Sequence, residues 1–281
     1  MSKRVGVIGY GIVGKAVRHV FSPFADQITI YDKYKDHSSL EQTVEGSDFL
    51  FLCVPTPFDF QRGCIDLGPL DEVVGEVAKV EPGNRICVIK STVVPGTTLR
   101  YQEQYPDLNM AMVPEFLREA TYLQDAENPD RVILGACEEE VASRLRDLYR
   151  MRFPYTPIFV VSPSEAELSK YMSNCYLAMK VIFGNLFSEY VESIDGDYDH
   201  VKEALTADHR ITDDHLDVTS EGGFGGKCLP KDLNALIGWA RARGLDAELL
   251  EEVWDKNLSV REDRDWESIP GASTGGTRPE R

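Results

Sequence analysis

The residues best suited to chemistry lie near residue 228, where a cysteine follows a run of glycines. Residues 221–232 read EGGFGGKCLPKD, with four glycines around Phe224 and then Lys227 and Cys228. Glycine is favoured where the backbone takes unusual dihedral angles or approaches another group closely. The thiolate is the nucleophilic form of cysteine, and neighbouring lysines favour it. The pattern predicts a ligand lying against the main chain, with the Cys228 thiol beside it.

A second set of residues forms a glycine fingerprint near the N-terminus. Gly9, Gly11 and Gly14 have the G-x-G-x-x-G spacing and follow the first predicted strand. The first glycine allows a tight turn, the second lets a pyrophosphate approach the backbone, and the third allows close packing of helix on strand. The N-terminus of the next helix offers free N–H groups to the diphosphate. The fingerprint predicts a dinucleotide site, and a glycine-rich turn without a nucleotide is the alternative.

An acidic residue indicates which dinucleotide is favoured. Asp32 ends the second predicted strand, about 20 residues after the fingerprint, where a carboxylate accepts the ribose hydroxyls and repels a 2′-phosphate. NAD is therefore favoured over NADP, although Lys33 follows directly.

These residues need a fold that positions them, and the hydrophobic pattern supplies one. Seven short apolar runs alternate with helical stretches, which is typical of right-handed βαβ units and a mostly parallel sheet covered on both faces. The runs lie at 4–9, 28–32, 48–54, 85–90, 109–113, 131–135 and 157–161. We expect a Rossmann-type, doubly wound α/β domain over residues 1–162.

The character of the chain changes after residue 162. Residues 162–194 have apolar residues at helical spacing and predict one long helix, capped by Ser162 or Ser164. Further helices are expected at 197–207, 230–243 and 246–263. We expect an all-helical domain over 163–265 and a flexible tail over 266–281, where Gly, Pro, Ser and Thr dominate.

The bulk composition excludes several classes of partner. The chain has 281 residues, 42% of them hydrophobic, with 47 acidic and 30 basic side chains and a net charge of −17. That charge repels nucleic acid and anionic membranes. No signal peptide or membrane-spanning run is visible, which predicts a cytoplasmic protein. The six cysteines are scattered, which predicts reduced thiols, five of them in cores, and no metal site.

Seven further sequence blocks occur along the chain in a recognisable order. They are VPTP at 54–57, KSTVVPGTT at 90–98, PEFLREA at 114–120, ENPDRVILG at 127–135, AELSKYMSNCYLAMK at 166–180, HRI at 209–211 and GFGGKCLPKD at 223–232. With the fingerprint, they resemble the nucleotide-sugar 6-dehydrogenases, the UDP-glucose/UDP-N-acetylmannosamine/GDP-mannose dehydrogenase family. The resemblance runs from residue 4 to about residue 260.

The resemblance implies a four-electron oxidation. Enzymes of this family use two NAD to convert a primary alcohol of a nucleotide sugar such as UDP-glucose into a uronic acid, a building block of polysaccharide biosynthesis. A thiol adds to the intermediate aldehyde as a thiohemiacetal, whose oxidation gives a thioester that water cleaves. By resemblance, Cys228 is that nucleophile.

Further catalytic roles follow from the same resemblance. Lys170 and Asn174 lie four residues apart, on one face of the predicted long helix, and stabilise the oxyanion. Asp232 helps to position water and proton transfer, Thr92 orders the catalytic water, and Glu115 is the proposed general base.

The resemblance also implies two sets of binding residues. Those expected at the cofactor are Gly9, Gly11, Ile12, Val13, Gly14, Asp32, Lys33, Val54, Pro55, Thr56, Ser91, Thr92 and Lys231. Those expected at the substrate are Glu115, Phe116, Leu117, Arg118, Glu119, Lys170, Asn174, Arg210, Phe224, Gly225 and Cys228. In the family the GFGG backbone lies against the sugar nucleotide, and Phe224 is expected under the loop.

A homodimer is the expected assembly. The long helix 163–194 is the predicted seam, with Arg210 reaching the substrate of the other subunit. The alternative is that the apolar face of this helix is used up within its own domain.

The resemblance does not extend to a third domain. Family members usually carry a second Rossmann-like unit for the nucleotide of the substrate, and this sequence has no pattern for it, so a short form is expected. Because binding energy from a remote group helps to position the reacting sugar, substrate affinity is the property most affected. Two alternatives stay open, a catalytically impaired NAD-binding remnant and a two-domain 3-hydroxyacid dehydrogenase.

Overall fold

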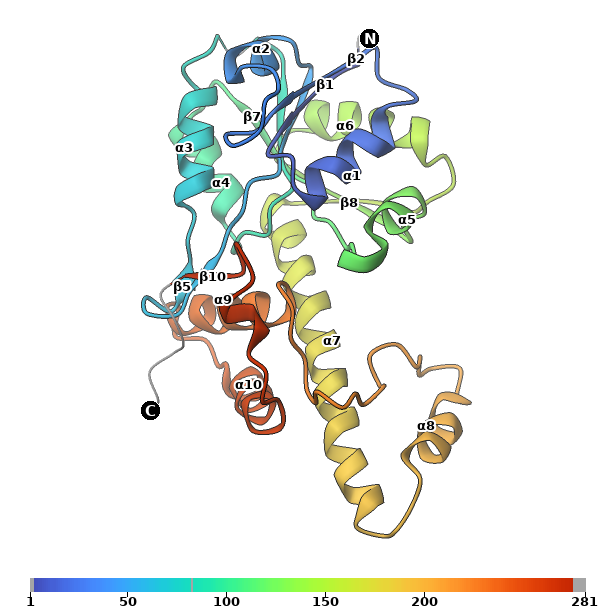
Figure 1. Ribbon diagram of the computed structural model, residues 1–281. Helices are drawn as coiled ribbons and strands as arrows, with labels where there is room; N and C mark the ends of the chain where they lie inside the picture. Colours follow the sequence, from blue (N-terminus) through green and yellow to red (C-terminus); the bar gives the residue numbers. More distant parts are fainter. Residues whose placement is uncertain (1–2, 82, 275–281) are drawn as a thin grey trace. The chain divides into compact units, whose positions relative to one another are not determined.

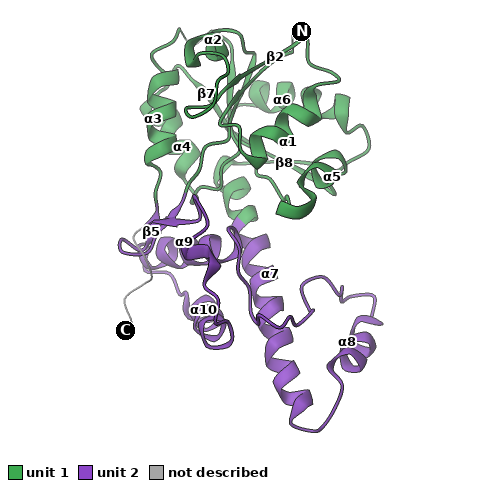
Figure 2. Cartoon of the chain, in the orientation of Figure 1, with its two compact units in different colours: residues 1–56, 66–170 green, residues 57–65, 171–281 purple. Residues whose placement is uncertain are grey.

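The computed structural model describes residues 3–81 and 83–274, which divide into two compact units (Figure 2). Unit 1 contains the chain up to Thr56 together with Asp66–Lys170, and unit 2 contains Pro57–Ile65 and the chain from Tyr171 onward. The predicted boundary after residue 162 therefore differs from the observed one after Lys170. The segment Pro57–Ile65, which the prediction gave to the first domain, belongs to unit 2.

Unit 1 is built on a seven-stranded sheet with the strand order β2-β1-β3-β6-β7-β8-β9 (Figure 1). Neighbouring strands are parallel except β7 and β8, which are antiparallel. The bounds are β1 (Arg4–Ile8), β2 (Gln27–Tyr31), β3 (Phe49–Leu52), β6 (Ile86–Ile89), β7 (Asn109–Met112), β8 (Val132–Ala136) and β9 (Ile158–Val161). All seven predicted strands are confirmed, as is the mostly parallel sheet.

Helices cover both faces of this sheet and explain why its strands are continuously apolar. Along β3, Phe49 and Phe51 join one core and Leu50 and Leu52 join the other, because successive side chains point to opposite faces. The helices of unit 1 are α1 (Ile12–Phe21), α2 (Leu40–Glu45), α3 (Gly68–Val77), α4 (Thr97–Gln104), α5 (Tyr122–Glu127) and α6 (Glu139–Arg152), with the 3₁₀ turn η1 (Glu119–Thr121) before α5. Burying one such Phe or Leu side chain contributes about 1.5–3 kcal/mol.

The long helix is α7 (Pro163–Glu192), which confirms the prediction of one uninterrupted helix after residue 162. Ser162 caps it, since the Ser162 hydroxyl accepts from the Glu165 N–H at 3.3 Å and the Glu165 carboxylate accepts from the Ser162 N–H at 2.8 Å. Proline at the first helical position suits this cap, because its missing N–H would be unpaired there in any case.

A buried carboxylate fixes the start of α7 within unit 1. Glu167 is fully buried and accepts from the Gly96 N–H at 2.6 Å and the Thr98 N–H at 2.7 Å. These N–H groups belong to the N-cap and the first turn of α4, where a helix favours a negative charge. Burial nevertheless raises the pKa of Glu167.

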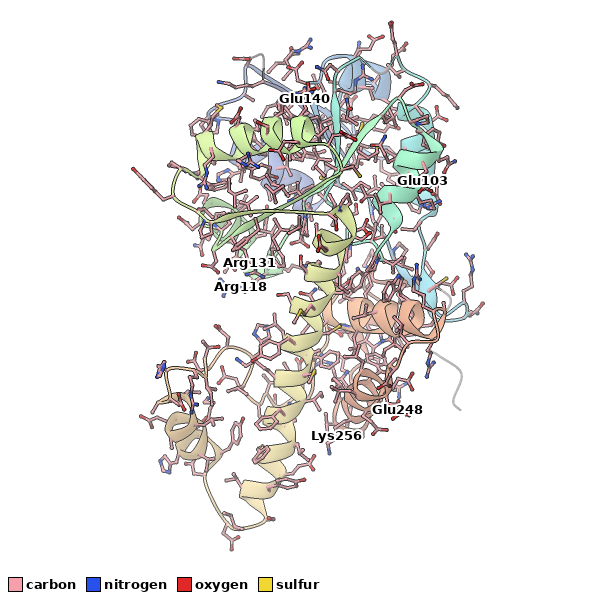
Figure 3. The ribbon with its side chains drawn as sticks, turned by 180° about the vertical axis from the view of Figure 1, so that it is seen from behind. Glu103, Arg118, Arg131, Glu140, Glu248 and Lys256 are labelled. Carbon is pink, nitrogen blue, oxygen red and sulfur yellow. The ribbon has the colours of Figure 1, made fainter. Side chains whose placement is uncertain are left out.

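Unit 2 is mainly helical, as predicted. It contains the rest of α7, α8 (Tyr198–Thr206), α9 (Leu229–Arg241), α10 (Glu248–Val260) and the 3₁₀ turn η2 (Asp265–Glu267). Lys256 of α10, labelled in Figure 3, pairs with Glu189 of α7 at 2.9 Å. An unpredicted addition is a sheet of three two-residue strands in the order β10-β4-β5, namely β4 (Phe58–Asp59), β5 (Cys64–Ile65) and β10 (Ser273–Thr274). Within the described ranges, no helix is long and apolar enough to cross a membrane.

An aromatic cluster forms the core of unit 2. The ring of Trp254 lies 5.4 Å from that of Trp266, 6.2 Å from that of Phe224 and 6.3 Å from that of Phe60. The prediction of a tail from residue 266 is therefore wrong for residues 266–274, because Trp266 is buried and β10 pairs with β4. The rest of the predicted tail, residues 275–281, lies outside the described residues.

Candidate active site

The glycine fingerprint has the geometry that a dinucleotide site requires. Gly9 has a φ of 89°, and a Cβ there would lie 2.7 Å from the Cys53 carbonyl oxygen. A Cβ on Gly14 would lie 2.0 Å from the Gly9 carbonyl oxygen. Gly11, just before α1, has no atom within 4 Å of the corresponding position. The outer glycines are thus required by the protein itself, while the middle one leaves space for a pyrophosphate beside the N-terminus of α1.

The Asp32 carboxylate lies next to this turn. It accepts from the Tyr10 N–H at 2.7 Å and from the Tyr34 N–H at 3.0 Å. Partial burial opposes ionisation, but these N–H groups and the Lys35 ammonium together hold the pKa of Asp32 below its usual value. An anionic carboxylate at the end of β2 fits the ribose of NAD.

Two lysines lie beside Asp32, and only Lys33 was considered from the sequence. The Lys33 ammonium pairs with Glu72 at 2.8 Å, whereas the Lys35 ammonium donates to the Tyr10 carbonyl at 2.6 Å and lies 3.4 Å from Asp32. Lys33 as a cofactor ligand stays a prediction. Lys35 was missed, because its role depends on how the chain folds back after β2.

Two neighbouring loops at the carboxyl ends of β3 and β6 carry other predicted cofactor residues. The Ser91 hydroxyl donates to the Val54 carbonyl at 2.6 Å, and the Thr56 hydroxyl donates to the Thr92 carbonyl at 2.7 Å. Parallel neighbouring strands end at the same edge of a sheet, where ligands of such folds bind. The structure therefore brings together residues 54–56 with Ser91 and Thr92, while Ile12 and Val13 form the first turn of α1.

Glu115 and Lys170 form a close pair in unit 1. The Lys170 ammonium lies 3.3 Å from the Glu115 carboxylate, and the Leu117 N–H donates to the same carboxylate at 2.7 Å. Lys170 is only 3% exposed, and its ammonium lies 5.4 Å from the centre of the Phe116 ring. The structure thus brings together two of the predicted catalytic residues, and the role of Glu115 as general base stays a prediction.

A second buried lysine, Lys90, was missed by the sequence analysis. Its ammonium donates to the Pro114 carbonyl at 3.3 Å, directly before Glu115. Burial lowers the pKa of Lys90 to about 8, although the negative charge of Glu115 opposes the shift. The sequence places Lys90 at the end of a central strand, directly before Ser91 and Thr92. This placement was the sequence feature that could have identified it.

The loop after Glu115 is held by its own ion pair. Arg118, labelled in Figure 3, donates to Asp125 at 2.6 Å, and this contact is the main reason that the pKa of Asp125 falls to about 2. Arg118 and Glu119 are exposed. The predicted contacts of residues 115–119 with a substrate stay predictions.

In unit 2, a buried hydrogen-bonded group lies between α7 and α9. The Asn174 side-chain amide donates to Asp232 at 2.5 Å, and the Lys231 ammonium holds the other oxygen of the same carboxylate. Asp232 is 1% exposed. The structure thus brings together the predicted catalytic residues Asn174 and Asp232. It also pairs Asp232 with Lys231, which was predicted as a cofactor ligand.

Cys228 stands apart from the buried cysteines. It is exposed and lies at the residue before α9, where the helix N-terminus stabilises a negative charge. Burial raises the pKa of Cys87 and of Cys175 to about 12, which suits inert core thiols. The expectation of five core cysteines is wrong for Cys137, which is exposed, and for Cys64, which is only partly buried.

The glycines before Cys228 pack mostly against protein. A Cβ on Gly222 would lie 2.3 Å from the Val260 carbonyl oxygen, one on Gly223 would lie 2.3 Å from Asn257, and one on Gly225 would lie 2.4 Å from Arg261. Only at Gly226 is no atom found within 4 Å. Close contact with α10 and the residues after it therefore explains three of the four glycines, where the sequence analysis invoked the substrate alone.

Two other predicted substrate residues are placed as follows. Phe224 is 4% exposed, as expected for a ring under the loop, so a substrate contact there would involve its main chain. Arg210 is exposed, and its guanidinium pairs with Asp208 at 2.5 Å. A role for either residue stays a prediction.

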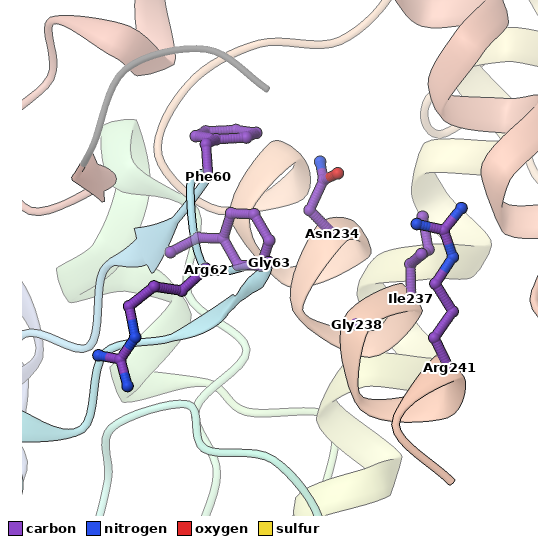
Figure 4. A pocket seen from close by; sticks show the side chains of 8 residues that line it. Phe60, Arg62, Gly63, Asn234, Ile237, Gly238 and Arg241 are labelled. Atoms are coloured by element: carbon purple, nitrogen blue, oxygen red, sulfur yellow. The ribbon is translucent and has the colours of Figure 1, made fainter. Parts of the chain in front are cut away.

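A cavity of about 270 Å³ lies between the β4–β5 hairpin and α9, within unit 2 (Figure 4). Its lining consists of Phe58, Phe60, Arg62, Gly63, Asn234, Ile237, Gly238 and Arg241. None of these belongs to the predicted site. Among the described residues, no group of three His, Cys, Asp or Glu side chains is arranged to hold a metal ion.

Comparison with known proteins agrees with this geometry. Residues 29–152 match the NAD binding domain of the UDP-glucose/GDP-mannose dehydrogenase family, and residues 164–259 match the central domain of that family. The first match confirms the prediction of NAD as the cofactor.

Individual UDP-glucose 6-dehydrogenases are also similar to this chain in sequence. The chain is 34% identical over 227 residues to UDP-glucose 6-dehydrogenase AglM of Haloferax volcanii, covering 75% of this chain and 52% of that protein. It is 30% identical over 251 residues to UDP-glucose 6-dehydrogenase YwqF of Bacillus subtilis, covering 85% and 56%. The chain therefore spans about half the length of these relatives.

Solved structures extend the comparison to the fold. A UDP-glucose dehydrogenase from Pyrobaculum islandicum superimposes with a TM-score of 0.84 at 29% identity, covering 92% of this chain and 68% of that one. A UDP-D-ManNAc dehydrogenase from Pyrococcus horikoshii superimposes with a TM-score of 0.78 at 22% identity, covering 91% of this chain and 68% of that one. This second likeness concerns the fold alone.

Proposed function

Because this chain belongs to the UDP-glucose/GDP-mannose dehydrogenase family, we propose that it oxidises the primary alcohol of a UDP-glucose-like nucleotide sugar to the uronic acid. The observation that carries the proposal is the exposed Cys228 at the start of α9, one helical turn before the Asp232 carboxylate that Asn174 holds. An exposed thiol at a helix N-terminus is the arrangement expected of a nucleophile.

Residues of unit 1 would hold most of the cofactor. Gly11 and the first turn of α1 would bind the diphosphate of NAD, and Asp32 would bind its adenosine ribose. When bound, NAD supplies the hydride acceptor for both oxidations.

In the first oxidation, Glu115 takes the hydroxyl proton of the sugar as the alcohol carbon loses a hydride. Lys170 and Asn174 donate hydrogen bonds to the oxygen, which stabilises its developing negative charge. The product of this step is an aldehyde.

In the second oxidation, the Cys228 thiolate adds to the aldehyde carbon and forms a C–S bond. The resulting oxyanion receives a proton and becomes a thiohemiacetal. Loss of a second hydride, with the hydroxyl proton, gives a thioester. Water ordered by Thr92 and Asp232 attacks the thioester carbon, the C–S bond breaks, and the acid and the free thiol are released.

A homodimer is part of the proposal. Six side chains of α7 that are 38–73% exposed recur on one face of the helix, namely Leu168, Met172, Tyr176, Phe183, Phe187 and Tyr190. An apolar stripe that the described part of the chain leaves exposed supports a second copy as its occupant. Arg210 as a residue shared across that interface and a cytoplasmic location remain predictions from the sequence.

The yield of NADH tests the function. We expect two NADH per sugar consumed from one member of a panel of UDP- and GDP-sugars, and loss of the second NADH in Cys228→Ala. Cofactor binding without turnover over the whole panel would favour the NAD-binding remnant. One NADH per substrate on a hydroxyacid, with Cys228→Ala unaffected, would indicate the two-domain 3-hydroxyacid dehydrogenase.

A further inference from the structure

The main chain of the glycine loop, residues 222–226, is held by side chains that the proposed mechanism does not use. Asn257 is fully buried, accepts from the Phe224 N–H at 2.7 Å and donates to the Phe224 carbonyl at 3.1 Å. Asn185 accepts from the Gly223 N–H at 3.0 Å. Both asparagines fix the first half of the loop.

Two charged residues hold the two ends of the loop. Both carboxylate oxygens of Asp265 lie 3.0 Å from the Gly226 nitrogen, which donates to them. The Arg261 guanidinium donates to the Gly222 carbonyl at 3.1 Å and lies 3.5 Å from Asp265. Arg261 is 6% exposed. The loop is thus fastened at Gly222 and at Gly226 by one ion pair.

The second of these ends lies two residues before Cys228. Gly226 has a φ of 75°, a left-handed conformation that glycine adopts without strain. In this conformation its N–H donates to the Asp265 carboxylate, and a charged acceptor strengthens the hydrogen bond. The chain then enters α9 at Cys228. The direction in which the chain leaves Gly226 therefore sets where the thiol lies.

Asp265 is itself firmly placed in unit 2. The neighbouring Trp266 is 2% exposed and packs on Trp254, and its carbonyl accepts from the Ser273 hydroxyl at 3.0 Å. Strand β10 then pairs with β4. Arg261 and Asp265 lie after residue 259, where the match to the central domain of the family ends.

We propose that Asp265, supported by Arg261, is a positioning residue that holds the glycine loop so that Cys228 is presented to the aldehyde. The proposal rests on the function proposed above, because it assigns the thiol a role in the second oxidation. If Asp265 only stabilised the fold, its loss would slow both hydride transfers equally. If Asp265 positions the thiol, its loss slows mainly the second transfer, because only that step uses the thiol.

The test compares Asp265→Ala with Asp263→Ala in the full chain. Asp263 is an exposed acidic residue of the same segment and is the matched control. In a Cys64→Ser/Cys137→Ser background, Cys228 is alkylated with a trifluoromethyl label. The width of its ¹⁹F NMR line reports how freely the side chain moves. In parallel, the two hydride transfers are timed in single turnovers without the label.

We expect the label in Asp265→Ala to give a line at least twofold narrower than in the control. We expect the second hydride transfer to slow by roughly tenfold or more, and the first to change by less than about twofold. Arg261→Lys, which keeps the charge but loses the forked donor, should show both effects more weakly. It serves as the second variant if Asp265→Ala does not fold.

Two results would overturn the proposal. One is a line width equal to that of the control, and the other is an equal slowing of both hydride transfers, which a merely structural role would produce. Failure of the proposed function is recognised separately, because Cys228→Ala would then retain the second oxidation. The line width would still decide whether Asp265 fixes the loop.

Discussion

Asn174 of α7 and Asp232 of α9 are joined by a 2.5 Å hydrogen bond between a side-chain amide and a carboxylate that is 1% exposed. Lys231 pairs with the other carboxylate oxygen and is 7% exposed. A buried charge is tolerated in a protein when it is paired and hydrogen-bonded, so each of these side chains depends on the other two.

Removing the carboxylate from this group should destabilise the protein. Asp232→Ala leaves the Lys231 ammonium buried without a counter-charge, which costs about 3–5 kcal/mol. Thermal and urea unfolding would measure the loss, with Asp214→Asn at an exposed position as the control. In the double variant Lys231→Met/Asp232→Leu most of the stability should return, because no charge is left unpaired. A double variant no more stable than Asp232→Ala would contradict the account.

Gly11→Ala should separate cofactor binding from folding. No atom lies within 4 Å of the added methyl group, so the melting temperature should stay unchanged. The methyl group would occupy the path of the pyrophosphate, and we expect the Kd for NAD to rise about tenfold or more, equivalent to about 1.4 kcal/mol. Calorimetric titration with NAD is the measurement. Gly75→Ala within α3 is the control and should bind NAD normally. Unaltered affinity for NAD in Gly11→Ala would show that the fingerprint does not bind the cofactor.

Lys90→Met should stabilise the protein in a pH-dependent way. Burial lowers the pKa of Lys90 from 10.5 to about 8, so holding the ammonium charged costs about 3 kcal/mol below pH 8. This cost disappears as the pH rises from 8 to 10.5, since the unfolded chain then binds more protons than the folded one. The melting temperature of the variant should therefore exceed that of the wild type at pH 7, and the difference should shrink by pH 10. A constant difference across this range would mean that Lys90 does not titrate as described.

The apolar stripe of α7 gives a prediction about assembly. Phe187→Glu places a charge on a helix face where Phe183 and Tyr190 are also exposed, so a dimer that buries this face should dissociate. Sedimentation or light scattering would show the change in mass. Phe159→Glu on β9 of unit 1, at a residue 52% exposed, is the matched control. Loss of the dimer in both variants, or in neither, would locate the interface elsewhere.

The sequence alone sufficed for the parts of the fold that depend on local pattern. The seven strands are short runs rich in apolar residues and are separated by helices, so their existence and their type could be read from residue order. The start of α7 was equally legible, because Ser162, Pro163 and Glu165 form a local cap. The roles of the fingerprint glycines could be assigned from the sequence, because each role depends only on the turn that contains the glycine and on the strand and helix next to it.

What could not be predicted depends on contacts between distant residues. The hairpin within Pro57–Ile65 joins unit 2 through two-residue strands, one of which pairs with Ser273 and Thr274, and such short strands have no hydrophobic period. The polar composition after residue 266 suggested a tail, yet the single buried ring of Trp266 anchors that segment. The glycines at 222, 223 and 225 are required by residues of α10 and just beyond it, about 35 positions later, which no local pattern indicates.

A covalent bond between substrate carbon and the Cys228 sulfur is the central claim, and mass spectrometry of the acid-quenched enzyme tests it most directly. During turnover of an active nucleotide sugar with NAD, we predict that the peptide containing Cys228 gains the acyl group of the oxidised sugar nucleotide, in place of the thiol hydrogen, as a thioester. Hydroxylamine should release this adduct, and Cys228→Ser should not accumulate it as a thioester. Accumulation of two NADH per sugar with no adduct on this peptide at any quench time would contradict the account.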